Sequence, residues 1–139
     1  MARHRHSLRQ ARRRLPRRHR PPRDHPMASA IRRHDLGETL TQAAVREVRE
    51  ETGIECEVTG LIGIYSNPNH VIAYDDGEVR QEFSICFRAK PFGGQLRTSS
   101  ESKEVHWVTP EKLDGLRLHP SIGLRIDHAL KQGNVPFFS

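Results

Sequence analysis

The sequence is poor in cysteine and in aromatic side chains, and it has no long apolar run. Of its 139 residues, two are cysteines and 6% are aromatic. No stretch of about 18 apolar residues occurs, so the sequence predicts no membrane-spanning helix. Cys56 and Cys86 form neither a CxxC pair nor a metal-ligand spacing with histidine, and we interpret both as reduced, buried thiols. These absences favour a single-domain cytoplasmic protein.

Acidic residues are almost absent from the first 33 positions. Residues 1–33 contain twelve arginines and one acid, Asp24, for a charge of +11, whereas residues 34–139 sum to −5. Four prolines interrupt this segment and no apolar period runs through it. We therefore predict that residues 1–33 are a disordered tail without regular strands, and that residues 34–139 form the folded domain.

The patterns after residue 33 predict a mixture of helices and strands. A helix is expected over 38–52 and a second amphipathic helix near 119–133, with Ile122 and Ile126 on its packed side. Val, Ile and aromatic residues predict strands at 55–66 and 81–90, and the latter turns Phe83, Ile85 and Phe87 inward. A helix, then strands, then a helix predicts an α/β fold, an α/β/α sandwich with a mixed sheet.

Three glutamates crowd one face of the first predicted helix. Glu47, Glu50 and Glu51 stand at i, i+3 and i+4, so their carboxylates would repel one another unless something compensates. Arg46 lies four residues before Glu50 and can hold that carboxylate in one rotamer. Clustered carboxylates also match the oxygen ligands that Mg²⁺ takes in proteins. The spacing therefore indicates a site for a hard divalent cation.

The segment around these glutamates resembles a known motif. From Glu38 it runs as seven residues and then Arg46-Glu47-Val48-Arg49-Glu50-Glu51-Thr52-Gly53-Ile54. This resembles the Nudix box: Gly, five residues, Glu, seven residues, Arg-Glu, an aliphatic, any residue, Glu-Glu, any residue, Gly and an aliphatic. Eight of the nine specified positions match over residues 32–54. The resemblance implies a Nudix-like sandwich that is incomplete on its N-terminal side.

The resemblance also implies a chemistry. Nudix hydrolases use Mg²⁺ or Mn²⁺ to hydrolyse a nucleoside diphosphate linked to another group, here ADP-ribose or a (deoxy)nucleoside triphosphate. Glu50 and Glu51 would be the main metal ligands, and Glu47 would be a further ligand or the general base. Arg46 would orient the glutamates. The cation would assist the attack of water on a pyrophosphate.

Acids and aromatic residues outside the box are further candidates. Among later loops, Glu101 is the first candidate for an additional catalytic acid, ahead of Glu104 and Glu82. His70 and Tyr74 are weak candidates for contacts to a base or ribose, and packing of a surface loop is the competing interpretation. Nucleotide binding would draw on all of these loops.

The chain departs from the motif at its first glycine, which is replaced by Arg32. Arg33 follows, where the family has a Pro-Gly-Gly-like loop that approaches the metal and phosphate closely. Glu38 would anchor the loop to the helix, and Gly53 would let the chain leave the helix tightly. The substitution predicts that the activity of the chain as written is impaired.

Three interpretations of residues 1–33 remain open. The arginines could bind nucleic-acid phosphates in a salt-dependent way, or the segment could be an appendage of an inactive paralogue. Translation in the wrong frame is favoured, because Arg, Pro, His and Ala dominate and the break falls inside the motif. The alternative function is a non-catalytic, Arg-tailed nucleic-acid-binding protein on a decayed Nudix domain. A homodimer is also open.

Overall fold

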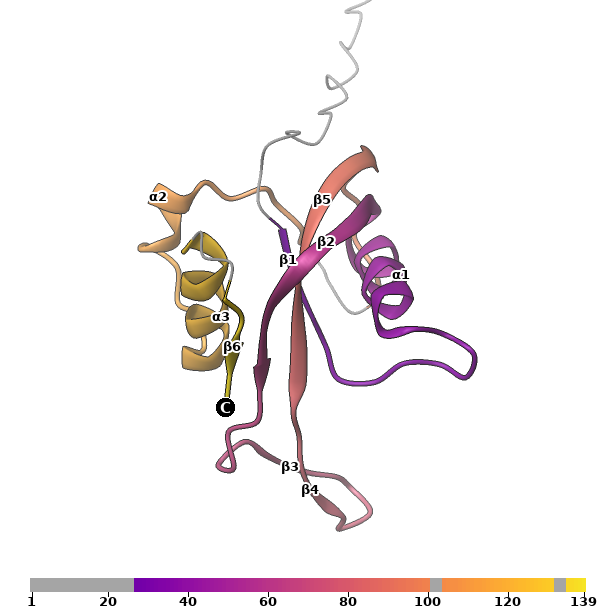
Figure 1. Cartoon of the computed structure of the whole chain (residues 1–139), viewed down its shortest axis with the longest axis vertical. Helices are drawn as coiled ribbons and strands as arrows, with labels where there is room; N and C mark the ends of the chain where they lie inside the picture. The colour runs from indigo at the N-terminus through magenta and orange to yellow at the C-terminus, as the bar shows by residue number, and fades with distance from the viewer. Residues whose placement is uncertain (1–26, 101–103, 132–134) are drawn as a thin grey trace, which may run out of the picture.

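The computed structural model describes residues 27–100, 104–131 and 135–139. Its elements are β1 (Met27–Ile31), α1 (Leu40–Thr52), β2 (Ile54–Tyr65), β3 (Val71–Ala73), β4 (Val79–Gln81), β5 (Ser84–Gly94), α2 (Pro110–Leu113), α3 (Pro120–Leu130) and β6 (Phe137–Phe138). Figure 1 shows β2 and β5 at the centre, with α1 on one side and α3 on the other. This arrangement confirms the predicted α/β sandwich. In the described ranges, no helix meets the length and hydrophobicity needed to cross a membrane.

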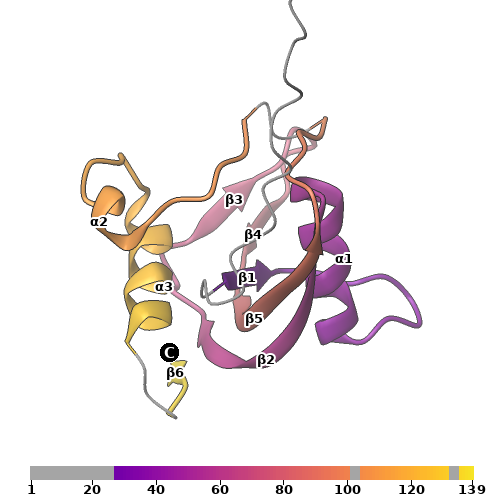
Figure 2. The same cartoon turned by 90° about the horizontal axis from the view of Figure 1, so that it is seen from above.

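The central sheet is mixed and curled. Its strand order is β1-β5-β2-β6. Strand β5 is antiparallel to both β1 and β2, whereas β6 runs parallel to β2. Register shifts along β2 increase the local twist, and Figure 2 shows β2 and β5 curving between the helices. Strands β3 and β4 form a separate hairpin that projects from the far end of these strands (Figure 1).

Strand β1 corrects one prediction. Residues 1–33 were expected to lack regular strands, yet Met27–Ile31 pairs with β5, from Met27 opposite Ala89 to Ile31 opposite Ile85. Ser29 and Ile31 are buried and alternate with exposed alanines, so the strand uses an ordinary two-residue period. The loop before α1 is therefore anchored to the sheet. The rest of the predicted tail, residues 1–26, lies outside the described residues.

The inward face of β5 also differs in part from the prediction. Ile85 and Phe87 pack against the cluster of Ile31, Ala43 and Ala44 below α1, but Phe83 is 57% exposed. The other face of the strand is buried as well, because Cys86 packs against α3. A strand covered by helices on both sides need not alternate in polarity.

Local signals define both ends of α1. Thr39 accepts a hydrogen bond from the Gln42 N–H at 3.2 Å, and the Gln42 side chain accepts one from the Thr39 N–H at 2.9 Å. This reciprocal cap satisfies two otherwise unpaired donors. At the other end, Gly53 adopts a left-handed conformation with φ 77° and donates to the Arg49 carbonyl. Ala43 and Ala44 are fully buried, so the opposite side of the helix faces solvent.

Replacing Gly53 with alanine should lower the free energy of unfolding more than the same change at Gly37. Both glycines have a positive φ, 77° and 79°, which costs an alanine about 1–2 kcal/mol. An added Cβ at Gly53 would also overlap the Gln95 carbonyl oxygen, whereas the space at Gly37 is open. Urea denaturation of G53A and G37A measures the difference. Equal losses would contradict the close approach of Gln95 to Gly53.

Candidate functional site

Arg46 joins three carboxylates near the start of α1. Its Nε and Nη2 atoms donate to the two oxygens of Glu38 at 2.7 and 2.9 Å. Its Nη1 atom donates to Glu50 at 3.1 Å, and an oxygen of Asp35 lies 3.6 Å from Nε. A two-point bond of this kind fixes the plane of the guanidinium as well as its position. The side chain therefore links the loop before α1 to the exposed side of the helix.

The pKa of Glu38 reports the strength of this link. The hydrogen bond from Arg46 lowers the pKa of the Glu38 carboxyl to about 2, and the backbone N–H of Asp35 contributes in the same direction. The same bond raises the pKa of Arg46. Glu38 is therefore ionised over the whole physiological range and holds the loop through a charge-assisted pair.

Glu47 and Glu51 face an unfavourable electrostatic environment. The pKa of Glu47 is raised, first by partial burial and then by the negative charge of Glu51, while the charges of Arg46 and Arg33 oppose the shift. Two carboxylates that perturb each other across one helical turn provide hard oxygen donors that a divalent cation would neutralise. The chemistry of the donors thus fits Mg²⁺ or Mn²⁺.

The side chains do not form a ready-made cage. In the part of the chain that the structure describes, no three His, Cys, Asp or Glu residues converge closely enough to hold a metal. Glu50 is 59% exposed and turned towards Arg46. Cation binding would therefore require the glutamates to reorient, which an exposed side chain does at small cost.

The structure brings two further predicted residues together beside the loop. The Tyr74 hydroxyl donates to Glu82 at 2.9 Å, and Arg32 lies 3.6 Å from the other oxygen of Glu82. The Arg80 guanidinium stacks over the Tyr74 ring at 5.1 Å. Glu82 is thereby placed next to the segment that leads into α1, although its sequence position lies between two strands.

The other two predicted acids, Glu101 and Glu104, are not seen next to α1 in the described residues. Glu101, the first candidate for an additional acid, lies outside the described residues. Glu104 is 79% exposed and contacts His106 at 2.9 Å. Nothing in that contact directs Glu104 towards α1.

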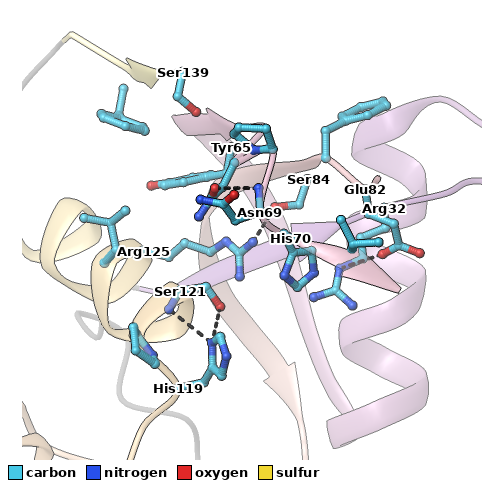
Figure 3. Close-up of a pocket in the computed structure, with 17 residues that line it drawn as sticks. Arg32, Tyr65, Asn69, His70, Glu82, Ser84, His119, Ser121, Arg125 and Ser139 are labelled. Atoms are coloured by element: carbon cyan, nitrogen blue, oxygen red, sulfur yellow. Dashed lines mark hydrogen bonds and ion pairs between the residues drawn. The ribbon is translucent and has the colours of Figure 1, made fainter. Parts of the chain in front are cut away.

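A cavity of about 770 Å³ lies on the α3 side of the sheet. Its lining combines the loop before α1, the ends of β2 and β5, the first turns of α3 and the C-terminal strand (Figure 3). His70, a weak candidate for substrate contact in the sequence, lines this cavity, whereas Arg125, Ser84 and Ser121 were not among the candidates. Ile122, predicted on the packed side of α3, is 46% exposed, so the predicted apolar face of this helix did not single out Arg125.

The sequence is similar to a known domain family and to several curated proteins. The sequence profile of the NUDIX domain matches residues 12–128. A MutT-like protein of Streptomyces ambofaciens is 43% identical over 79 residues, which cover 57% of this chain and 45% of that protein. An ADP-ribose pyrophosphatase of Methanocaldococcus jannaschii is 36% identical over 87 residues, 59% of this chain and 45% of that protein.

A vertebrate relative covers more of the chain. The 8-oxo-dGDP phosphatase NUDT18 of Danio rerio is 33% identical over 106 residues, 73% of this chain and 29% of that protein. The chain therefore matches less than half of the length of each of these three relatives. The match to the NUDIX profile includes the glutamate-rich helix α1. The names of the last two relatives give different substrates.

Acidification should destabilise the protein through Glu38. The pKa of this carboxyl is about 2 in the folded state and 4.5 without its partners. The Arg46 pair therefore contributes stability above about pH 4.5 and loses it as the pH falls towards 2. Urea denaturation at a series of pH values measures the effect.

The matched variants are Glu38→Gln and Glu111→Gln, the latter at an exposed position on α2. E38Q should lose this part of the acid dependence of the free energy of unfolding, and E111Q should keep it. Identical pH profiles for E38Q and the wild type would show that the pair with Arg46 contributes nothing to acid stability.

Proposed function

Because the chain belongs to the Nudix family, we propose that it hydrolyses the diphosphate linkage of a nucleoside diphosphate joined to another group. The arrangement of Arg46, Glu50 and the crowded pair Glu47 and Glu51 carries this proposal. ADP-ribose and (deoxy)nucleoside triphosphates are the substrate classes we favour. A relative named as an ADP-ribose pyrophosphatase supports the first class, and one named as a nucleoside triphosphatase supports the second.

Carboxylates of α1 would hold the catalytic cation. Glu50 and Glu51 would be the main ligands of Mg²⁺ or Mn²⁺, and Glu47 would be a further ligand or the general base. When bound, such a cation neutralises negative charge on the diphosphate and activates water. The repulsion between Glu47 and Glu51 supports this assignment, because the cation would relieve it.

Arg46 would act by positioning Glu50. Since two of its nitrogen atoms are occupied by Glu38, the third can hold the Glu50 carboxylate in a defined direction. The hydrogen bond keeps the Glu50 carboxylate beside the helix, from which it would turn towards a bound cation. We therefore assign Arg46 and Glu38 to the geometry of the site rather than to the reacting atoms.

Arg32 and Arg33 are the residues for which the sequence predicts impaired activity. Strand β1 anchors their loop to the sheet, so the loop is better supported than the sequence indicated. The positive charge of Arg33 nevertheless lies close enough to lower the pKa of Glu47. The same charge would repel a cation bound there. Nucleic-acid binding through residues 1–33 stays a hypothesis from the sequence, since residues 1–26 lie outside the described ranges.

Removing one charge from the cluster tests the function. Glu50→Gln and Glu51→Gln should each lower metal-dependent hydrolysis by about a hundredfold or more, since even outer-shell changes cost about 10–100-fold. Their free energies of unfolding should stay equal to that of the wild type or rise slightly, because like-charge repulsion is relieved. Phosphate release from ADP-ribose and deoxynucleoside triphosphates with Mg²⁺ is the assay.

Glu111→Gln on α2 is the control and should retain wild-type turnover. Wild-type rates in E50Q and E51Q would overturn the assigned metal ligands. Unfolding of both variants would instead show that the carboxylates are structural partners of Arg46, and the hydrolase proposal would lose its main support.

A further inference from the structure

Arg125 on α3 is a cation whose charge is not neutralised by a neighbouring acid. Its Nη2 atom donates to the Ser84 hydroxyl at 2.6 Å, and its guanidinium lies 5.1 Å from the centre of the Tyr65 ring. Among the described residues, no Asp or Glu lies within ion-pair distance of it. Its Nε atom is buried and makes no hydrogen bond. A guanidinium has five N–H donors, so most of this capacity is unused.

The Arg125 side chain lines the cavity on the α3 side of the sheet. Figure 3 shows the Arg125 guanidinium pointing into the space between Tyr65, Ser84 and His70. Other donors in the lining are Arg32, His119, Ser121 and the two asparagines Asn67 and Asn69. A partly buried cation that faces a cavity is stabilised by an anion or by several hydrogen-bond acceptors.

The carboxylate side chain in the described lining is that of Glu82. Its Oε1 atom accepts a hydrogen bond from Tyr74 at 2.9 Å, while its Oε2 atom lies 3.6 Å from Arg32 and is buried without a hydrogen bond. Ser139 lines the opposite part of the cavity and is hydrogen-bonded to Ser66. Neither residue forms an ion pair with Arg125.

Two further features favour an anion. The first turn of α3 lines the cavity through Pro120 and Ser121, and the N-terminus of an 11-residue helix carries a partial positive charge. The Nε2 atom of His70 is buried without a hydrogen-bond partner, so a second polar atom in the cavity lacks a partner. The apolar walls from Phe83 and Phe137 leave room for a ring that carries the anionic group.

The cavity adjoins the segment that leads to the glutamate helix. Arg32 lines the cavity, and the charge of the next residue, Arg33, acts on Glu47. One extended ligand could therefore place its diphosphate near α1 and another group in the cavity. A volume of about 770 Å³ is within the usual range for small-molecule sites.

We propose that Arg125 binds a second anionic group of the substrate, a phosphomonoester or carboxylate remote from the scissile diphosphate. The inference deepens the proposed function and rests on it. The planar fork of arginine matches both anions in two-point hydrogen bonds. Arg125 is thus a specificity-determining residue that selects among nucleoside diphosphate derivatives by their additional charge.

Three pairs of compounds differ by a single anionic group. NADP⁺ and NAD⁺ differ by a ribose phosphate, coenzyme A and dephospho-coenzyme A by another, and UDP-glucuronic acid and UDP-glucose by a carboxylate. In at least one pair, the wild type should have a kcat/KM about 10- to 100-fold higher for the compound with the extra anion, as expected for hydrogen bonds to a charged group. The pairs separate a phosphate from a carboxylate.

Variants of Arg125 assign the preference to this side chain. Arg125→Gln should reduce the ratio of kcat/KM within the preferred pair to about 1, and Arg125→Lys, which keeps a point charge, should give an intermediate ratio. Arg117→Gln changes an exposed arginine outside the cavity lining and should keep the wild-type ratio. Circular dichroism checks that each variant is folded.

Equilibrium binding without metal tests the inference independently of turnover. Calorimetry compares adenosine 2′,5′- and 3′,5′-bisphosphate with AMP, and glucuronic acid 1-phosphate with glucose 1-phosphate. Tighter binding of an extra anion that is lost in R125Q supports the inference even if no hydrolysis occurs, in which case only the proposed function fails. Hydrolysis without a preference in any pair, or a preference that survives in R125Q, overturns the inference and leaves the function intact.

Discussion

The two-point bond between Arg46 and Glu38 is the interaction on which the candidate site depends. It joins the loop after β1 to the helix that carries the glutamates, and it leaves one guanidinium nitrogen for Glu50. Asp35, Glu38 and Glu50 all share this cation. Without it, the loop and the helix face would bring negative charges together with little to oppose their repulsion. The same side chain therefore stabilises the fold locally and orders the carboxylates.

The sheet connects this site to the cavity near α3. Strand β1 is at the edge of the sheet, and the segment that follows it reaches both places: Arg32 lines the cavity, while Glu38 meets Arg46. Helices α1 and α3 cover opposite faces (Figure 1). The segment between β1 and α1, held at one end by a strand and at the other by a charge-assisted bond, therefore connects the two groups of residues along the chain.

The sequence predicted the helix and its glutamates because those signals are local. The stop at Gly53 and the spacing of the carboxylates lie within one short segment. The predicted start at residue 38 was two residues early, because the cap at Thr39 begins the helix at Leu40. Strand β1 was missed because its partner is β5, distant in the sequence, and an arginine-rich context hid its short apolar period. Arg125 was missed for the same reason, since Ser84, its partner, lies 41 positions away. Contacts between distant segments leave little trace in local patterns.

The loss of the first motif glycine is better accommodated than the sequence indicates. A bulky residue in this loop was expected to obstruct the site, yet the Arg32 side chain is 48% exposed and pairs with Glu82 at 3.6 Å. Only the arginine end of this pair is exposed, because the Glu82 side chain is 19% exposed, so Arg32 is the partner of a largely buried carboxylate. The charge of Arg33 favours the ionised form of Glu47. A cationic loop beside clustered carboxylates weakens the attraction for a metal ion while it strengthens the attraction for an anionic substrate. How far these opposing effects lower the activity of the chain stays a prediction from the sequence.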